Sequence, residues 1–272
     1  MPAGNELTEN RAAPVSETPV SETVAAPVAP AVEPVLAVAV PSNISQQCRD
    51  HAVDSKACRF HWGSAFLQSW EFAGVQTLMN MAPDAPLRYR AFHGKWIRNW
   101  FDAVSNIEWT RWNDGDPWYG TYVGHPLMGA VYSNIYIQND PRGMALPIST
   151  SGAYWTSRLR AGVWSTAWAV QWKVGPLSEA SVGNTGNFSY YSTSSKAMTN
   201  GTGLADFIIT PAGGFVFGVG EDILDRYVIT RLESVSTNPA FLVAAGILNP
   251  TRSVANMLRF KAPWYRDSRK VR

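Results

Sequence analysis

Three polar side chains in separate parts of the chain have the types needed for acid, base or metal chemistry: His125, Glu179 and Asp206. A histidine can exchange a proton near neutral pH or bind a metal ion, and a carboxylate beside it can orient it. Asp206 lies in an otherwise apolar stretch, where a buried carboxylate needs a partner. We expect the three to form one polar cluster between helices, with a structural, metal-binding or catalytic role.

His125 follows segment 112–124, which contains more acidic, aromatic and glycine residues than a purely structural loop would need. We predict a loop over 113–124 that delivers His125 to the start of a helix, because Pro126 suits the first helical position. A histidine at such a place can also bond free backbone N–H groups, which is the structural alternative to a chemical role.

A metal site is a second kind of chemistry that the sequence allows. Its candidate ligands are Asp114, Asp116, His125 and Glu221. The stretch Asn113-Asp-Gly-Asp116 only partly matches a calcium loop, since its glycine comes too early and no closing glutamate follows. The sequence does not specify a cofactor.

The two cysteines, Cys48 and Cys58, have nine residues between them. With His51 and His61 they could complete a zinc site, although this spacing is unusual for a zinc module. The pattern favours the alternatives, either a disulfide, which would indicate a compartment outside the cytoplasm, or two thiols without a role.

Several familiar catalytic motifs do not occur in the sequence. The glycine-rich stretch 213–220 lacks both the lysine of a P-loop and the third glycine of a dinucleotide fingerprint. Neither Gly-x-Ser-x-Gly nor His-Glu-x-x-His is present. No histidine follows His125, which excludes a two-histidine phosphatase mechanism.

Composition divides the chain into three parts. Residues 1–45 contain no aromatic residue and five Glu against one Arg, so we predict a disordered acidic tail. A helical domain is predicted over 46–262, followed by a basic tail over 263–272. Because 251–272 holds seven Lys or Arg against one Asp, this end could contact anionic lipid; nucleic acid is not expected as a partner, and the oligomeric state is not indicated.

Aromatic residues recur every four positions over 62–70 and over 164–172, which is the spacing of one helical face. We predict an all-α fold, a compact bundle of short helices rich in Gly and Trp. The predicted helices cover 62–81, 92–104, 126–138, 151–173, 204–217 (kinked at Pro211), 221–232 and 239–248, with a long loop over 181–202. Glycines one turn apart, such as Gly214 and Gly218, or Gly129 with Ser133, indicate close helix contacts.

Two further expectations concern charge and membranes. Asp222 precedes Arg226 by four residues, so we predict an ion pair between them on one helix. Every apolar run near the twenty residues of a spanning helix is broken by Pro, Gly or polar amides, so spanning is not expected, whereas peripheral or re-entrant membrane contact is compatible with the sequence.

Seven short segments, which with their surroundings cover roughly 62–269, carry a resemblance to a known family: Trp112-Asn-Asp-Gly-Asp116, Tyr122-Val-Gly-His-Pro126, Tyr154-Trp-x-Ser-Arg-Leu-Arg160, Gly175-Pro-Leu-Ser-Glu-Ala180, Asp206 with Thr210-Pro211, Gly220-Glu-Asp222, and Leu248-Asn-Pro-Thr-Arg-Ser253. Through them the chain resembles an uncharacterised bacterial envelope family, number 3943 among the domains of unknown function. Its order of His-, Glu- and Asp-bearing helices is also similar, less closely, to the teicoplanin-resistance type of envelope protein. The resemblance implies a place in the cell envelope and no established activity. Membrane association is expected from the tryptophans and the basic end, which could contact lipid or a partner. Family members usually carry an export signal, which is not visible here, so the cytoplasm is the alternative location.

Two functions therefore fit the sequence. One is a non-enzymatic, membrane-associated envelope protein with a structural or interaction role. The other is a hydrolase or metal-dependent enzyme that uses His125, Glu179 and Asp206. The enzyme requires these side chains within about 4 Å of one another in an open pocket, because a catalytic base must reach its substrate. Carboxylates paired only with basic side chains or backbone would favour the structural role.

Overall fold

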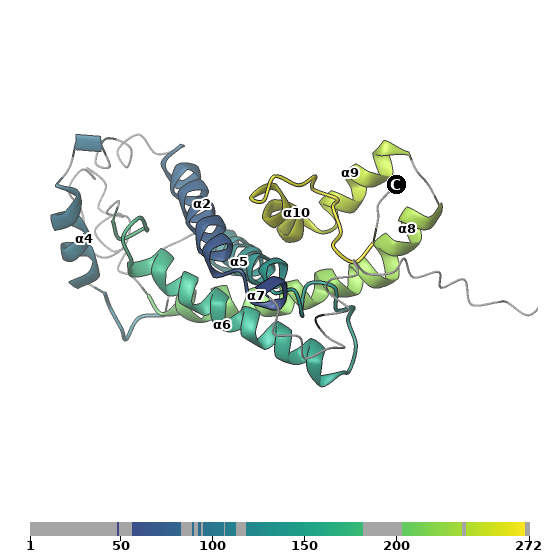
Figure 1. The fold of residues 1–272 in the computed structure, drawn as a ribbon. Coiled ribbons are helices and arrows are strands. Elements are labelled where there is room, and N and C mark those ends of the chain that lie inside the picture. The colour runs from purple at the N-terminus through teal and green to yellow at the C-terminus, as the bar shows by residue number, and fades with distance from the viewer. Residues whose placement is uncertain are drawn as a thin grey trace, which may run out of the picture. The chain divides into compact units, whose positions relative to one another are not determined.

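The structure, a computed structural model, describes residues 48, 56–82, 89, 92–93, 95–105, 107–112, 118–181, 203–235 and 238–269, and the statements below concern these residues. Their regular elements are all helical, without a strand among them, so the predicted all-α class is confirmed (Figure 1). The predicted disordered tail over 1–45 lies outside the described residues, and so does the predicted loop over 181–202 apart from Ser181. Contacts group 38–272 into one unit that holds every described helix.

The elements follow one another as a series of helices and two π-helical turns. In chain order they are the 3-10 turn η1 (Lys56–Cys58), α2 (Trp62–Met81), α4 (Trp96–Ser105), the π-helical turn η2 (Gly120–Gly124), α5 (His125–Asn139), α6 (Gly152–Val174), α7 (Ala205–Leu224), the π-helical turn η4 (Asp225–Ile229), α8 (Thr230–Val235), α9 (Pro239–Ile247) and α10 (Pro250–Met257). The bounds of α2, α5, α6 and α9 agree with the predicted ranges to within one residue.

The predicted loop before α5 is wrong where the structure describes it, because the backbone is helical from Trp118 onward. The turn η2 leads directly into α5, and Gly124 has helical dihedral angles (φ −61°, ψ −52°). His125 therefore lies within continuous helical backbone. Its predicted place at a free helix start, where it would bond unsatisfied N–H groups, is corrected by this continuity.

The two helices predicted over 204–217 and 221–232 form one continuous helical stretch, α7 followed by η4 and α8. Pro211 lies inside α7 without ending it. By length and composition 205–234 could cross a membrane, a test that the core helix of a soluble protein also passes. The sequence did not predict this length, because Pro211 and the glycines of α7 interrupt the apolar run. It also missed α10, which follows α9 after only two residues.

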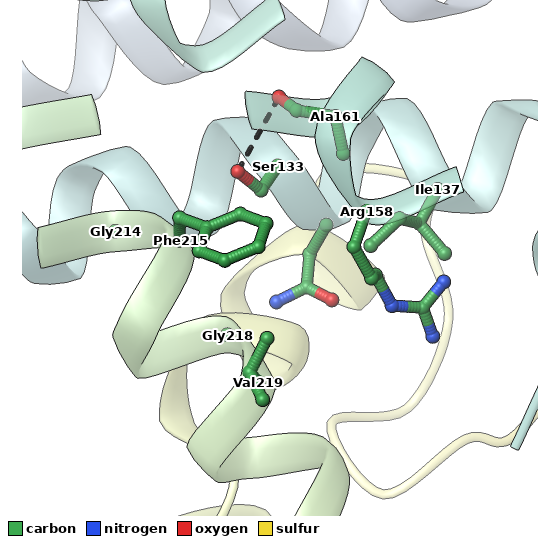
Figure 2. Close-up of a pocket in the computed structure, with 9 residues that line it drawn as sticks. Ser133, Ile137, Arg158, Ala161, Gly214, Phe215, Gly218 and Val219 are labelled. Atoms are coloured by element: carbon green, nitrogen blue, oxygen red, sulfur yellow. Dashed lines mark hydrogen bonds between the residues drawn. The ribbon is translucent and has the colours of Figure 1, made fainter. Parts of the chain in front are cut away.

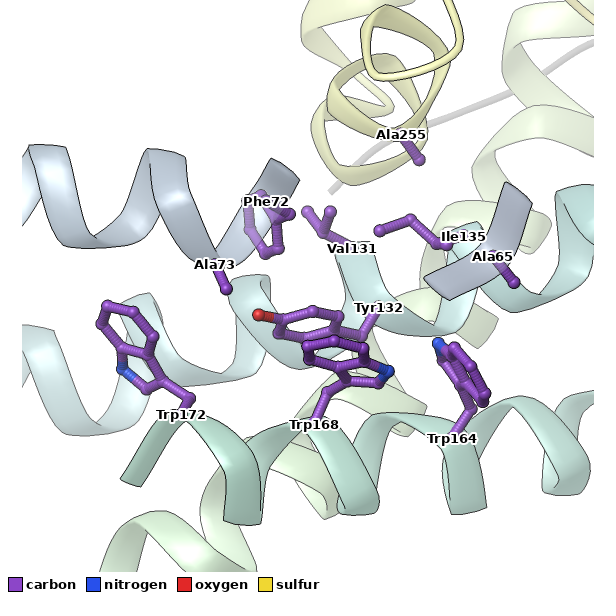
Figure 3. Close-up of a cluster of buried hydrophobic side chains, with 10 residues drawn as sticks. All are labelled: Ala65, Phe72, Ala73, Val131, Tyr132, Ile135, Trp164, Trp168, Trp172 and Ala255. Carbon is purple, nitrogen blue, oxygen red and sulfur yellow. The ribbon is translucent and has the colours of Figure 1, made fainter. Parts of the chain in front are cut away.

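The core lies where α5 packs against α2, α6, α7 and α10. Trp164, Trp168 and Trp172 all point from α6 toward this core, as their spacing predicts (Figure 3). Tyr132 of α5 stacks on Trp168 with ring centroids 5.5 Å apart and planes 11° apart. Its hydroxyl donates a 2.6 Å hydrogen bond to Gln76 Oε1 on α2, so this aromatic core ties three helices together.

The close helix contact predicted from small residues is confirmed at the crossing of α5 and α7. A β-carbon added to Gly214 would lie 2.6 Å from the carbonyl carbon of Gly129, and one added to Gly129 would overlap the carbonyl oxygen of Thr210. Only glycine allows two backbones to approach this closely. Gly218, one turn further along α7, has open space instead.

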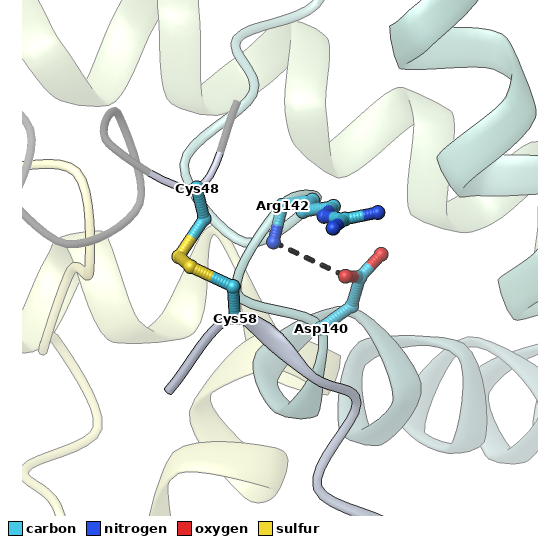
Figure 4. The surroundings of a disulfide bond; sticks show 4 residues. All are labelled: Cys48, Cys58, Asp140 and Arg142. Carbon is cyan, nitrogen blue, oxygen red and sulfur yellow. Dashed lines mark hydrogen bonds between the residues drawn. A yellow bond between two sulfur atoms is a disulfide. The ribbon is translucent and has the colours of Figure 1, made fainter. Parts of the chain in front are cut away.

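A disulfide joins Cys48 and Cys58, whose Cα atoms are 5.3 Å apart, beside the turn that holds Asp140 and Arg142 (Figure 4). The backbone N–H of His61 donates to the carbonyl of Asn139, which holds the start of α2 against the end of α5. Because both sulfur atoms are bonded to each other, the zinc site considered for these cysteines is wrong.

Candidate functional site

The three side chains expected to meet do so, around a lysine that the sequence did not single out. Lys173 Nζ, from the last turn of α6, donates to Glu179 Oε2 at 2.9 Å and to Asp206 Oδ2 at 2.5 Å. Glu179 lies in the turn after α6 rather than at the start of a helix, and Asp206 lies in the first turn of α7. The ammonium therefore joins the end of α6 to the start of α7.

His125 completes this polar cluster from the first turn of α5. Its Nδ1 lies 3.2 Å from Thr210 Oγ1 and 3.6 Å from Asp206 Oδ1. Because Gly129 and Thr210 touch one turn away, the tight crossing of α5 and α7 is what holds the imidazole at this distance from the carboxylate. The cluster thus draws on three helices that meet in the core.

Burial decides what this cluster can do. The side chains of Lys173, Asp206, His125 and Glu179 are between 3% and 6% exposed. The two carboxylates and the ammonium stabilise one another in such surroundings. Removing the ammonium, or the carboxylates, would leave a buried charge without its partner and without water. A substrate needs access to its base, so the arrangement fits a helix-joining ion cluster better than a catalytic centre.

Lys173 could have been found from the sequence. It follows Trp172 directly at the end of a helix whose aromatic face is buried, so its stem had to pass beside the core. A lysine is almost never fully buried unless paired. The nearest acidic residue after it is Glu179, which is the partner that the structure gives it.

The metal ligands suggested by the sequence do not assemble in the described part of the chain. Asp114 and Asp116 lie outside it. Glu221 lies in a different place from His125: it accepts hydrogen bonds from the backbone N–H of Thr251 at 2.8 Å and from the Thr251 hydroxyl at 2.5 Å. No group of three or more His, Cys, Asp or Glu among the described residues is placed to hold a metal ion.

A second buried ion network lies at the other end of α7, and its first centre is Asp222. One carboxylate oxygen accepts from Arg158 Nε at 2.7 Å and from the Tyr154 hydroxyl at 2.8 Å, while the other accepts from Arg252 Nη2 at 2.7 Å. The predicted pair between Asp222 and Arg226 is corrected, since Arg226 donates instead to the carbonyl of Ile148. The partners come from α6 and α10, so this carboxylate also joins helices.

Asp225 is the second centre of that network. Arg266 Nε lies 2.8 Å from Oδ1, and Arg269 donates through both Nη atoms at 2.9 and 3.0 Å. Burial alone would raise the pKa of the Asp225 carboxyl, but the charges of Arg252, Arg269 and Arg266 hold this pKa well below its usual range. The carboxylate is therefore strongly favoured over the protonated acid.

The basic C-terminal segment is engaged by the protein itself. Arg252 pairs with Asp222 of α7, Arg266 and Arg269 pair with Asp225 of η4, and Arg259 forms a bidentate pair with Asp267. The described chain thus packs past the predicted boundary at 262. These pairs do not favour the anionic-lipid contact expected of this end, because the four guanidinium groups already face carboxylates.

A pocket lined by described residues lies elsewhere, between α5, α6 and α7 (Figure 2). Its empty space is about 270 Å³ when space open to solvent is counted, and its otherwise apolar walls carry three polar side chains, those of Ser133, Asn134 and Arg158. Its lining consists of Ser133, Asn134, Ile137, Arg158, Ala161, Gly214, Phe215, Gly218 and Val219. None of His125, Glu179 and Asp206 belongs to it, so the polar cluster does not open into this pocket.

No protein-family model, curated protein or solved structure matches this chain. The resemblance to an uncharacterised envelope family accordingly stays a prediction from the motifs.

Proposed function

We propose that this protein is a membrane-associated, non-enzymatic protein of the bacterial cell envelope with a structural or interaction role. The observation that carries the proposal is an inverted distribution of side chains. Charged groups such as Asp206, Glu221 and Asp222 are turned into the helix contacts, whereas large apolar side chains cover the outer faces of neighbouring helices. Water-soluble monomers rarely expose broad apolar patches, and lipid is the surrounding in which such faces cost nothing.

The apolar outer face extends over three helices. On α2 it includes Leu67 and Leu78, 61% and 63% exposed; on α6 Val163 is 72% exposed, and on α7 Val216 is 70% exposed. The helices are neighbours, since Phe66 of α2 lies against Trp164 of α6, and α6 packs along α7. The exposed side chains therefore belong to adjoining elements.

Helix α7 shows the inversion most clearly. Between Phe207 and Leu224 the only charged residues are Glu221 and Asp222, and both are buried. The outer face of this stretch is free of charge over about 27 Å, at a rise of 1.5 Å per residue. Proline and glycine, which this helix contains at Pro211 and at several glycine positions, are more frequent in membrane helices than in soluble ones.

The disulfide is consistent with an envelope location. Disulfides persist in oxidising compartments and are rare in the cytoplasm of most organisms. The Cys48–Cys58 bond therefore supports an exported protein over the cytoplasmic alternative.

Cell fractionation tests the proposal. We expect the full chain to sediment with membranes and to remain there after an alkaline carbonate wash. Recovery in the soluble fraction would contradict membrane association. Val163→Glu together with Val216→Glu should leave about tenfold less protein in the membrane pellet, because a charge on a lipid-facing site is costly. Arg160→Glu is the matched control on α6, since that exposed position already carries a charge.

The alternative of a hydrolase or metal-dependent enzyme has one observation in its favour, the convergence of His125, Glu179 and Asp206. The burial of all three and the contact of both carboxylates with Lys173 support the structural role instead. We therefore do not propose an activity for this cluster.

A further inference from the structure

We infer that the exposed aromatic residues at the amino-terminal end of α7 form a collar that lies at the headgroup level of a phospholipid bilayer, with the apolar face of α7 extending from it into the hydrocarbon. The collar consists of Trp109, Trp112, Trp118, Tyr119 and Tyr122. This inference rests on the proposed membrane association and adds which end of the molecule meets the lipid–water boundary.

The collar residues come from two segments, 109–112 and 118–122, which a side-chain hydrogen bond joins. Trp112 Nε1 donates a 3.0 Å hydrogen bond to the Tyr122 hydroxyl, and the ring of Trp118 lies 5.8 Å from that of Tyr122. Trp118 and Tyr119 are 71% and 70% exposed, higher than most other aromatic side chains described. Exposed rings in this number are unusual for a face that meets only water.

Backbone hydrogen bonds fix the collar to α7. The N–H of Leu204 donates to the carbonyl of Arg111 at 2.8 Å, and the N–H of Ala205 donates to that of Trp112 at 2.9 Å. Trp109, 61% exposed, stacks on Phe207, the first residue of the charge-free stretch, with ring centroids 5.8 Å apart. The collar therefore lies where the apolar face of α7 begins.

The chemistry of these side chains selects a bilayer as the partner. Tryptophan and tyrosine combine an apolar ring with a polar N–H or O–H, and they concentrate where hydrocarbon meets headgroups. The same segment carries Glu108 and Arg111, an exposed ion pair with 3.7 Å between charged atoms, which suits the hydrated side of that boundary. A lipid surface provides both the hydrated headgroups and the hydrocarbon within the length of a few residues.

Depth-dependent quenching tests the collar. Single cysteines are introduced as Tyr119→Cys, Val216→Cys and Lys95→Cys in the full chain, each is labelled with a polarity-sensitive fluorophore without reducing the native disulfide, and the protein is reconstituted in phosphatidylcholine vesicles. Position 119 should be quenched about twofold more by a nitroxide on the headgroup than by one near the acyl-chain end, and position 216 should show the reverse order. Position 95, an exposed lysine before the collar, serves as the water-exposed control.

The outcomes separate the two proposals. If the protein does not float with the vesicles, membrane association itself is contradicted. If it floats but the label at 119 is unquenched, or is quenched most by the deep nitroxide, the collar is refuted while association stands. If labels at 119 and 216 are shielded without lipid and the protein sediments as a dimer, a second copy of the chain covers this face and the inference is overturned.

Discussion

Gly129 and Gly214 meet where α5 crosses α7, so closely that a β-carbon on Gly214 would lie 2.6 Å from the carbonyl carbon of Gly129. This contact sets the position of the polar cluster. His125 precedes Gly129 by one turn, and Thr210, its hydrogen-bond partner, precedes Gly214 by one turn. A backbone contact between two glycines thus determines the distance between a histidine and a carboxylate.

Replacing Gly214 by Ala should destabilise the protein by about 1–3 kcal/mol, because the new methyl group overpacks the crossing. Gly218→Ala is the matched control: it lies one turn away with open space around it, and the better helix propensity of Ala should leave stability unchanged or slightly raised. Thermal unfolding in a nonionic detergent measures both. Equal effects of the two substitutions would show that the crossing is not tight.

Replacing Lys173 by Met should cost about 3–5 kcal/mol, because the buried carboxylates of Glu179 and Asp206 lose the ammonium that both contact. Adding Asp206→Asn and Glu179→Gln to the same chain should recover part of the loss. Arg160→Met, at an exposed site on the same helix, should change stability by about 0.5 kcal/mol or less. An unchanged free energy of unfolding in Lys173→Met would contradict the ion cluster.

Asp225→Asn should destabilise the protein at neutral pH by about 3–5 kcal/mol, since three guanidinium groups lose a buried partner. The folded-state pKa of Asp225 lies below the unfolded value, so its stabilisation is present above about pH 4 and is lost as the pH falls further. Chemical unfolding across pH 2–7 should therefore show the difference between wild type and variant shrinking toward acid. A difference independent of pH would contradict the assignment, and Glu108→Gln, in an exposed pair, gives the reference for a weak interaction.

Replacing Cys48 and Cys58 together by Ser should lower stability by about 2–4 kcal/mol, the usual effect of removing a loop-closing disulfide. Wild-type protein treated with a reductant should unfold at the same temperature as this double variant, whereas the variant itself should not respond to the reductant. A wild-type protein indifferent to reduction would indicate that the bond is not formed in solution.

The helices could be predicted from the sequence where aromatic residues recur at helical spacing and a residue that ends a helix follows. The period over 62–70 and the prolines after 82 delimit α2, and Ser151 with Gly175 delimits α6. Prediction failed where tertiary contacts override local signals. Pro211 is accommodated inside α7, which packs against α5 and α6 along its length. The glycine-rich segment before α5 is helical because it forms the π-helical turn η2.

The polar cluster was predictable in its members but not in its purpose. Asp206 is predicted to need a partner because it lies in an apolar stretch, whereas His125 and Glu179 are predicted from side-chain types that suit acid–base or metal chemistry. Lys173 is the member that was missed, although its position directly after Trp172, with Glu179 as the next acidic residue, is a local signal for it. By contrast, Asp222 had a local partner in Arg226, and only the fold brings Arg158 and Arg252 closer.

The ion network around Asp225 also has a consequence in time. Arg266 follows Asp225 by 41 residues, so a ribosome adding about 5–20 residues per second needs about 2–8 s to make the partner after the carboxylate. During that interval Asp225, directly after the end of α7, has been translated, whereas its partners Arg266 and Arg269 have not. The far end of the nascent helix is therefore easiest to misplace while its apolar face is already complete, and residues that are translated later complete the contacts that hold it.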